Sequence, residues 1–258
     1  MLALIEFHYK SPNVLPMKSI SEILDHKDHR PFPYPDAAYK VYQEWHEAIF
    51  LHWELPVAVL QGMLPGGLEV DTLKGKAYIS LVAFKAENSR IKYLPSLPII
   101  SDFLEANVRT YVIKDGIPGI YFLSMKANKT ISAFMFRSIT GFPYYPSQMH
   151  HDNQSFSSYQ QQSKDYFDFS YKVGPLLSDK SELDRWLTER YCVYLDKYNK
   201  FLRFNVHHEE WPMQQLAIRD LRIRYQLEGY TLNNPQPVLA HYSPGVEVVG
   251  WLPEFLDI

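Results

Sequence analysis

The segment EANVRTYVI, residues 105–113, is followed by the turn Lys114-Asp115-Gly116 and then by GIYFLSMKA, residues 119–127. Both runs are rich in β-branched and aromatic residues, and a glycine-containing turn between two such runs predicts a β-hairpin. Successive side chains of a strand point to opposite faces of the sheet. One face of the first strand is therefore apolar, and the other carries Glu105, Asn107, Arg109 and Tyr111.

This polar face has two interpretations. It lines a polar cavity, or it faces water and carries a weak surface ion pair. Exposed ion pairs contribute little to stability and are common on the outside of sheets. Taken alone, the pattern favours the solvated face.

Strand patterns recur along most of the chain and predict a mainly β protein of the α+β class. The alternation of DYFDFSYKV, residues 165–173, is typical of a half-buried strand. Further strands are expected at residues 48–53, 67–72, 76–84, 188–195, 200–206, 217–227 and 245–252. A second hairpin is expected around Lys74-Gly75. So many strands in one domain favour an antiparallel β-barrel or a strongly curved sheet, because both limit exposed edges.

A few short helices complete the prediction. Residues 36–44 fit a helix with Asp36 as N-cap, and residues 56–65 fit one that begins at Pro56. Residues 130–140 place their large apolar side chains near one helical face. In residues 181–187, Ser181 and Asp184 occupy capping-box positions.

The chain of 258 residues divides into an N-terminal extension, residues 1–35, and a single domain, residues 36–258. The extension is proline-rich, and its SISEILDHK segment, residues 19–27, predicts one short helix. Disorder is the alternative for this extension. We favour docking on the main domain because of its apolar residues Leu2, Leu4, Ile5, Phe7 and Leu15.

Composition excludes several classes of partner and favours a cytoplasmic protein. The net charge is −3 and the chain has no long basic run, which argues against nucleic-acid binding. No apolar run approaches the roughly 20 residues of a spanning helix, so no membrane partner is expected. The single Cys192 and the absence of a secretory signal fit a reducing compartment. We interpret Cys192 as a small buried residue. A homo-oligomer stays open.

Two further segments carry candidate site residues. Arg137 precedes Gly141-Phe142-Pro143, which breaks the chain, and Tyr144 and Tyr145 follow between prolines. These tyrosines suit a pocket wall, or they pack with their hydroxyls bonded to backbone. In the predicted strand at residues 188–195, Glu189 and Arg190 point to opposite faces. One of them points inward and needs a partner, and Arg109 or Arg137 could serve Glu189.

The histidines do not predict a metal site. His207 and His208 are adjacent, and adjacent residues of a strand diverge. We therefore predict no metal and no cofactor. Because the chain has no GxGxxG, P-loop or GxSxG motif, nucleotide-binding and serine hydrolase functions lose support.

The order of several motifs resembles the YqjF-like family of uncharacterised proteins, whose fold resembles that of acetoacetate decarboxylase. The motifs run from Trp45 to Pro253 and include LPGGLEVDTLKGKAYISLVAF, EANVRTYV, GFPYY, LTERYCVY, VHHEEWPMQ and HYSPGVEV. The resemblance places Glu105 at the position of a decarboxylase strand glutamate. It also aligns Arg137 and Gly141-Phe142-Pro143 with a motif that continues into two lysines.

Tyr144 and Tyr145 replace those two lysines here. In the decarboxylases the first lysine forms a Schiff base with the substrate ketone, and the charge of the neighbouring lysine keeps its amine unprotonated. A phenol cannot form an imine. The resemblance therefore implies the scaffold and its cavity without Schiff-base decarboxylation.

Three functions remain, and we rank binding of a small carboxylate-bearing or aromatic molecule in a barrel cavity first. In that case Glu105 is locked in a salt bridge. An enzyme that works without a lysine, with Glu105 as base and Tyr144 as acid, ranks almost equally. It requires a closed cavity and a carboxylate with a perturbed pKa. Third is a protein–protein module with an exposed tyrosine-rich surface. The expected ligand-binding residues are Asn107, Arg109, Arg137, Tyr145, Glu189, Arg190, His207 and Trp211.

Overall fold

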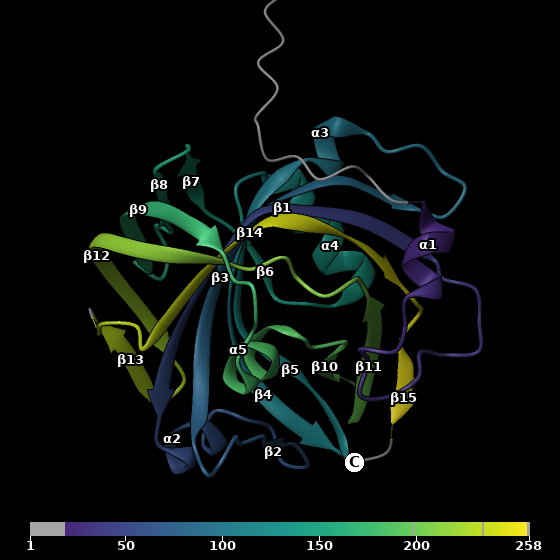
Figure 1. Ribbon diagram of the computed structural model, residues 1–258, viewed down its shortest axis with the longest axis horizontal. Coiled ribbons are helices and arrows are strands. Elements are labelled where there is room, and N and C mark those ends of the chain that lie inside the picture. Colours follow the sequence, from purple (N-terminus) through teal and green to yellow (C-terminus); the bar gives the residue numbers. More distant parts are fainter. Residues whose placement is uncertain (1–18, 198, 234, 257–258) are drawn as a thin grey trace, which may run out of the picture.

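Seven strands close into a ring in the computed structural model, which describes residues 19–197, 199–233 and 235–256 (Figure 1). The strand order around the ring is β11–β10–β5–β4–β3–β1–β14. Pairing of Val206 with Gly250 and of His207 with Val249 closes it between β11 and β14. The ring strands are β1 Val41–Leu55, β3 Ala77–Ile91, β4 Phe103–Lys114, β5 Ile117–Ala127, β10 Cys192–Lys197, β11 Lys200–His207 and β14 Leu239–Gly250.

The sheet continues from β14 into a second layer of strands, on the left of Figure 1. That layer contains β7 Gln148–His151, β8 Ser155–Tyr159, β9 Tyr166–Leu176, β12 Gln214–Leu227 and β13 Tyr230–Asn233. Short strands add to the ring: β2 Glu69–Val70 pairs with β4, β6 Tyr144–Pro146 with β5, and β15 Glu254–Leu256 with β11. The mainly β, curved-sheet prediction is confirmed, although β5 pairs in parallel with β6 and β10.

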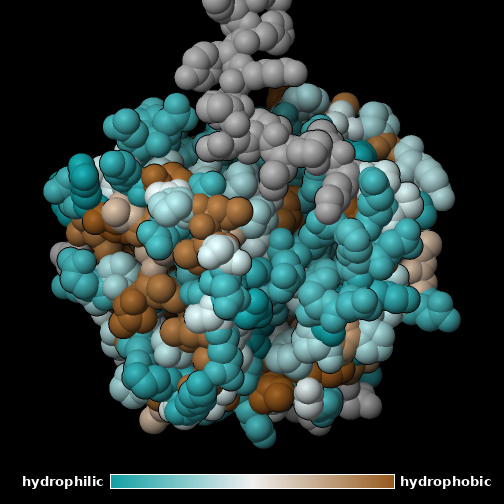
Figure 2. Space-filling model, in the orientation of Figure 1, coloured by the Kyte–Doolittle hydropathy of each residue, from teal (hydrophilic) through white to brown (hydrophobic). Residues whose placement is uncertain are grey.

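The central strands β1, β3 and β4 are buried on both faces. Their inner side chains, such as Phe50 and Phe84, belong to the core inside the ring. Their outer side chains, such as Leu51 and Val108, pack against the second layer, where Phe167 is fully buried. Figure 2 shows that the side formed by β9, β12 and β13 also presents more apolar surface than the region around α1.

Five short helices connect or cover the strands: α1 Ile20–Asp25, α2 Val57–Gln61, α3 Pro98–Ser101, α4 Thr130–Thr140 and α5 Glu182–Thr188. The predicted capping box of α5 is present, since Ser181 and Asp184 exchange hydrogen bonds with each other's backbone N–H groups. Helix α4 ends at Gly141, whose φ of 83° is the left-handed conformation that glycine adopts at least cost.

Three local predictions were wrong. Residues 41–44 belong to the long strand β1, and Asp36 caps no helix, because β1 pairs with β3 on one side and β14 on the other. Lys74-Gly75 does form a tight turn, but Glu69–Val70 pairs with β4 and not with β3. Thr188 ends α5, and the strand that follows begins only at Cys192, so Glu189 and Arg190 lie outside it.

The described part of the N-terminal extension packs on the ring. Ile23 of α1 is buried, and its carbonyl oxygen lies 2.8 Å from Nε2 of His207. Arg30 donates to the carbonyl oxygen of Val206 and lies over the ring of Tyr191. The apolar residues that favoured docking, Leu2, Leu4, Ile5, Phe7 and Leu15, lie outside the described residues.

A buried polar chain fastens α5 to the ring. Asp184 Oδ1 lies 2.8 Å from Nε2 of His241, and His52 continues the chain at 3.4 Å from His241 and 2.7 Å from Ser80. Ser80 contacts the hydroxyl of Tyr111, which donates to the carbonyl oxygen of Leu187 in α5. Burial holds the pKa of His52 well below its usual range. The helix is thereby held by groups that are costly to leave unpaired.

A bulge in β1 sets which side chains face the ring interior. Glu47 has a φ of 51°, and the register with β3 shifts between His46 and Ile49. The side chains of the cavity therefore come from Gln43 and Trp45 before the bulge and from Phe50 after it. Because the bulge changes which residues of β1 point inward, simple alternation along the strand does not predict all of them.

Gly245 permits this bulge, because its φ is 140° and an added Cβ would lie 2.3 Å from the carbonyl oxygen of Trp45. We expect Gly245→Ala to lower the free energy of unfolding by about 2–3 kcal/mol, measured by urea denaturation. Gly66→Ala is the control, since its Cβ would meet nothing within 4 Å. Equal stability of the two variants would contradict this role of Gly245.

Candidate functional site

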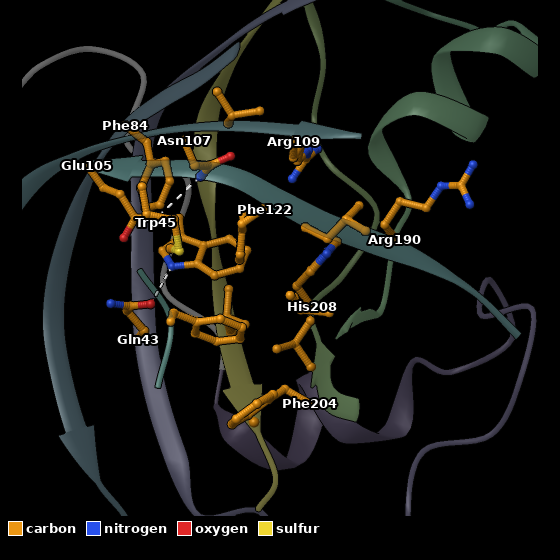
Figure 3. Close-up of a pocket in the computed structure, with 18 of the residues that line it drawn as sticks. Gln43, Trp45, Phe84, Glu105, Asn107, Arg109, Phe122, Arg190, Phe204 and His208 are labelled. Carbon is orange, nitrogen blue, oxygen red and sulfur yellow. Dashed lines mark hydrogen bonds between the residues drawn. The ribbon is translucent and has the colours of Figure 1, made fainter. Parts of the chain in front are cut away.

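A cavity of about 170 Å³ lies inside the ring, and all seven ring strands contribute to its lining (Figure 3). Helix α4 adds Phe136 and Thr140, and the segment after it adds Phe142 and Tyr144. An engineered apolar cavity of about 150 Å³ is enough to bind benzene. The space inside this ring is therefore sufficient for one small organic molecule.

Most of the wall is aromatic. Trp45 and Trp211 stack with ring centroids 5.9 Å apart, and Phe50 meets Trp211 edge-on at 5.1 Å. Other aromatic side chains of the wall are Phe84, Phe122, Phe136, Phe142 and Phe204. Such a wall favours a ligand with a flat apolar part.

The polar face of β4 points into this cavity and not into water, so the interpretation as a solvated face was wrong. Glu105, Asn107 and Arg109 are 4%, 3% and 8% exposed, and all three line the cavity. Figure 3 shows them in sequence along one strand. Tyr111, next on the same face, is fully buried beneath α5.

Glu105 forms a hydrogen-bonded pair with Tyr144. The Tyr144 hydroxyl donates to Oε2 of Glu105 at 2.7 Å, and Asn107 Nδ2 donates to Oε1 at 3.2 Å. Burial raises the pKa of Glu105 to about 7, although both hydrogen bonds oppose the shift. Burial and the neighbouring carboxylate raise the pKa of Tyr144 well above its usual range. Glu105 is thus a carboxyl group that titrates near neutral pH.

Arg109 is a buried guanidinium with few partners. Its Nη2 makes a 3.5 Å contact with the carbonyl oxygen of Leu187, and the guanidinium also interacts with the hydroxyl of Tyr111 and lies 5.7 Å from the centre of the Phe50 ring. Its buried Nε has no hydrogen-bond partner among the described residues. No ion pair joins it to a carboxylate in the part of the chain that the structure describes. Burial lowers the pKa of Arg109. A guanidinium has five N–H donors, so part of its hydrogen-bonding capacity is unused here.

Arg190 and Glu189 have structural partners. Arg190 Nη1 lies 2.6 Å from Asp71 Oδ2, so the guanidinium points away from the cavity that its stem lines (Figure 3). Glu189 pairs with Lys180 at 2.8 Å and accepts from the hydroxyl of Tyr191. The sequence had suggested Arg109 or Arg137 as the partner of Glu189, and this suggestion was wrong.

Three other expected site residues lie outside the cavity wall. Arg137 is exposed on α4 and lies over the ring of Tyr145, which is also exposed. His207 is buried against α1 and Arg30. Of the expected residues, the cavity brings together Glu105, Asn107, Arg109, Tyr144 and Trp211, with the stem of Arg190.

Sequence reasoning missed several wall residues, among them Trp45, Phe84, Phe122, Phe204 and His208. Val82 and Phe84 are two residues apart in β3 and therefore share a face, so alternation could have predicted that both line the cavity. Trp45 gave no such signal because of the bulge at Glu47. His208 is fully buried, and burial lowers its pKa to about 3.

One cluster of possible metal ligands occurs among the described residues, on the outside of the ring. It comprises Glu44, His46 and Glu87. Glu44 already accepts hydrogen bonds from Tyr42 and Asn88 and contacts His46 at 3.1 Å. This set is therefore satisfied without an ion.

The chain belongs to the DUF2071 family, described as an uncharacterized conserved protein, which matches residues 42–247. It is 33% identical over 225 residues to the uncharacterized protein YqjF of Bacillus subtilis, covering 84% of this chain and 93% of that protein. The predicted YqjF-like membership is confirmed.

Solved structures confirm the acetoacetate decarboxylase-like fold. Acetoacetate decarboxylase from Legionella pneumophila has a TM-score of 0.60 at 13% identity, covering 96% of this chain and 98% of that one. The enduracididine biosynthesis enzyme MppR complexed with pyruvate has a TM-score of 0.59 at 11% identity, covering 86% of this chain and 92% of that one. At such identities the likeness is one of fold. In the described residues, no helix is long and apolar enough to cross a membrane.

The raised pKa of Glu105 makes a prediction about stability. Between its ordinary pKa of 4.5 and about 7, the folded state holds a proton that the unfolded state has released. Stability therefore falls as pH rises through this window. We expect Glu105→Gln to lose this dependence. The difference in free energy of unfolding, variant minus wild type, should therefore increase by about 2–4 kcal/mol between about pH 4.5 and pH 8. Parallel stability curves in urea would contradict the buried carboxyl.

Proposed function

We propose that this protein binds a small carboxylate-bearing molecule in the ring cavity, with the carboxylate against Arg109. The observation that carries the proposal is the buried guanidinium of Arg109, which has no anionic partner among the described residues and borders the cavity. A buried cation is costly unless an anion compensates it. A carboxylate matches the planar fork of the guanidinium.

The aromatic wall supports a ligand whose remaining part is flat and apolar. Trp211 and Trp45 offer ring faces, and the polar groups are confined to one strand and Tyr144. One structure of similar fold was solved with pyruvate, itself a small carboxylate. An unfilled cavity also favours ligand binding over the function as a protein–protein module.

Binding is tested with hydrocinnamate, which carries one phenyl ring and one carboxylate. We expect it to raise the Tm of the wild-type protein, whereas the uncharged hydrocinnamamide does not. Arg109→Gln should weaken hydrocinnamate binding about 10- to 100-fold in calorimetry, because a charge-assisted hydrogen bond is lost.

Arg137→Gln is the matched control, since Arg137 is exposed on α4, lies over the ring of Tyr145 and is not part of the cavity wall. It should bind hydrocinnamate as wild type does. Equal binding of the acid and the amide, or equal losses in both arginine variants, would contradict a carboxylate site at Arg109.

Acid–base catalysis on the bound molecule is the second candidate, and the state of Glu105 favours it. In the described chain Glu105 has no salt bridge, and its pKa of about 7 suits a general base. Glu105 would take a proton from the carbon next to a ligand carbonyl, and Tyr144 would donate to the carbonyl oxygen. The cavity wall holds no lysine among its described residues, so this chemistry uses no imine.

The catalytic candidate is tested with benzylpyruvate in deuterium oxide. We expect the protein to accelerate deuterium incorporation at the carbon next to the ketone, with a rate that rises through about pH 7 as Glu105 ionises. Glu105→Gln should abolish the acceleration while leaving benzylpyruvate binding within a few fold. Exchange that is unchanged in this variant would exclude Glu105 as the base.

A further inference from the structure

Asn107 is the second incompletely paired group on the cavity wall. Its Nδ2 donates to Glu105, which fixes the orientation of the amide, and its Oδ1 has no hydrogen-bond partner among the described residues. The side chain is 3% exposed, so bulk water does not satisfy this oxygen. A buried acceptor left unpaired destabilises the folded protein, and a ligand that donates to it removes this cost.

The two incompletely paired groups are neighbours on one strand face. Asn107 and Arg109 are two residues apart in β4, which corresponds to about 6.7 Å along the strand. Arg109 offers only donors, whereas the group of Asn107 without a partner is its acceptor oxygen, since one N–H of its amide nitrogen already donates to Glu105. A ligand complementary to both presents an anion and, a few bonds away, a hydrogen-bond donor.

We infer that the ligand of this cavity is an aromatic carboxylate with a hydroxyl or amino group on the carbon next to the carboxylate. The carboxylate meets Arg109, the donor meets Oδ1 of Asn107, and the ring packs against the aromatic side chains of the wall. This inference rests on the proposed carboxylate site and adds Asn107 as the residue that determines specificity.

An acceptor that faces Oδ1 of Asn107 does not fit. An ether oxygen there, or a carbonyl oxygen turned toward Oδ1 and not toward the hydroxyl of Tyr144, would place two acceptors against each other in a site shielded from water. While Glu105 is ionised, turning the amide over would present Oδ1 to its carboxylate. The pairing with Glu105 thus gives the site its preference for a donor.

The test compares ligands that differ at one position on the unmodified protein. Both enantiomers of phenyllactate carry a hydroxyl donor, phenylalanine carries an amino donor, hydrocinnamate carries hydrogen, and α-fluorohydrocinnamate carries fluorine of similar size to a hydroxyl. We expect one enantiomer of phenyllactate, or phenylalanine, to bind about tenfold or more tightly than hydrocinnamate and its fluorine analogue in calorimetry. The tighter binder of phenyllactate and phenylalanine shows whether the donor on the ligand is a hydroxyl or an amino group.

Asn107→Leu, which removes the acceptor at similar volume, should reduce this preference to within about twofold. Arg109→Gln should weaken all of these acids together and keep their order. If hydrocinnamate binds as tightly as both donor-bearing acids, or if Asn107→Leu keeps the preference, the donor inference is overturned while the carboxylate site stands. If none of the acids binds at millimolar concentration, the proposed function is wrong and the inference falls with it.

Discussion

The two residue pairs that join β11 to β14 close the sheet into a ring and so create its enclosed interior. Without them β1, β3, β4 and β5 would form an open sheet whose inner face meets water. With them, the strands form a ring of seven. A ring of about eight strands has an interior just wide enough for its own side chains or one small ligand. The side chains that point inward therefore decide whether a cavity remains, and here polar residues of β4 face aromatic residues of the other strands.

Closure also determines the electrostatics of the site, because it removes water from charged groups. The chain pairs other buried charges: Arg190 with Asp71, Lys126 with Asp165, and Lys180 with Glu189. Glu105 and Arg109 have no such partners among the described residues. Unpaired buried charges destabilise a fold, and these two groups lie on the wall of the same cavity.

Local signals predicted the elements whose formation is local. The hairpin of β4 and β5 follows from its turn, α5 from its capping box, and β9 from strict alternation. The helix expected at residues 36–44 failed because β1 gains its hydrogen bonds from β3 and β14, which are distant in sequence. Pairing with such remote strands overrides a weak local preference.

The same reason explains which parts of the site were predictable. Alternation placed Glu105, Asn107 and Arg109 on one face, but only the second layer, formed by β7, β8, β9, β12 and β13, shows that the opposite face is also buried. The resemblance to the decarboxylases pointed to Glu105 and Tyr144. No sequence pattern could place Trp45, because the bulge at Glu47 changes the face of β1 partway along the strand.

The exchange of a lysine motif for Tyr144 changes what the cavity can do. While Glu105 is ionised, its carboxylate holds the Tyr144 proton, and Tyr144 has no donor left for a ligand. When Glu105 takes up a proton, the phenol is released to donate elsewhere. Because burial brings the pKa of Glu105 to about 7, both states are populated near neutral pH. A proton taken from a ligand by Glu105 would therefore free the donor that stabilises the resulting oxyanion, which couples acid and base within one hydrogen bond.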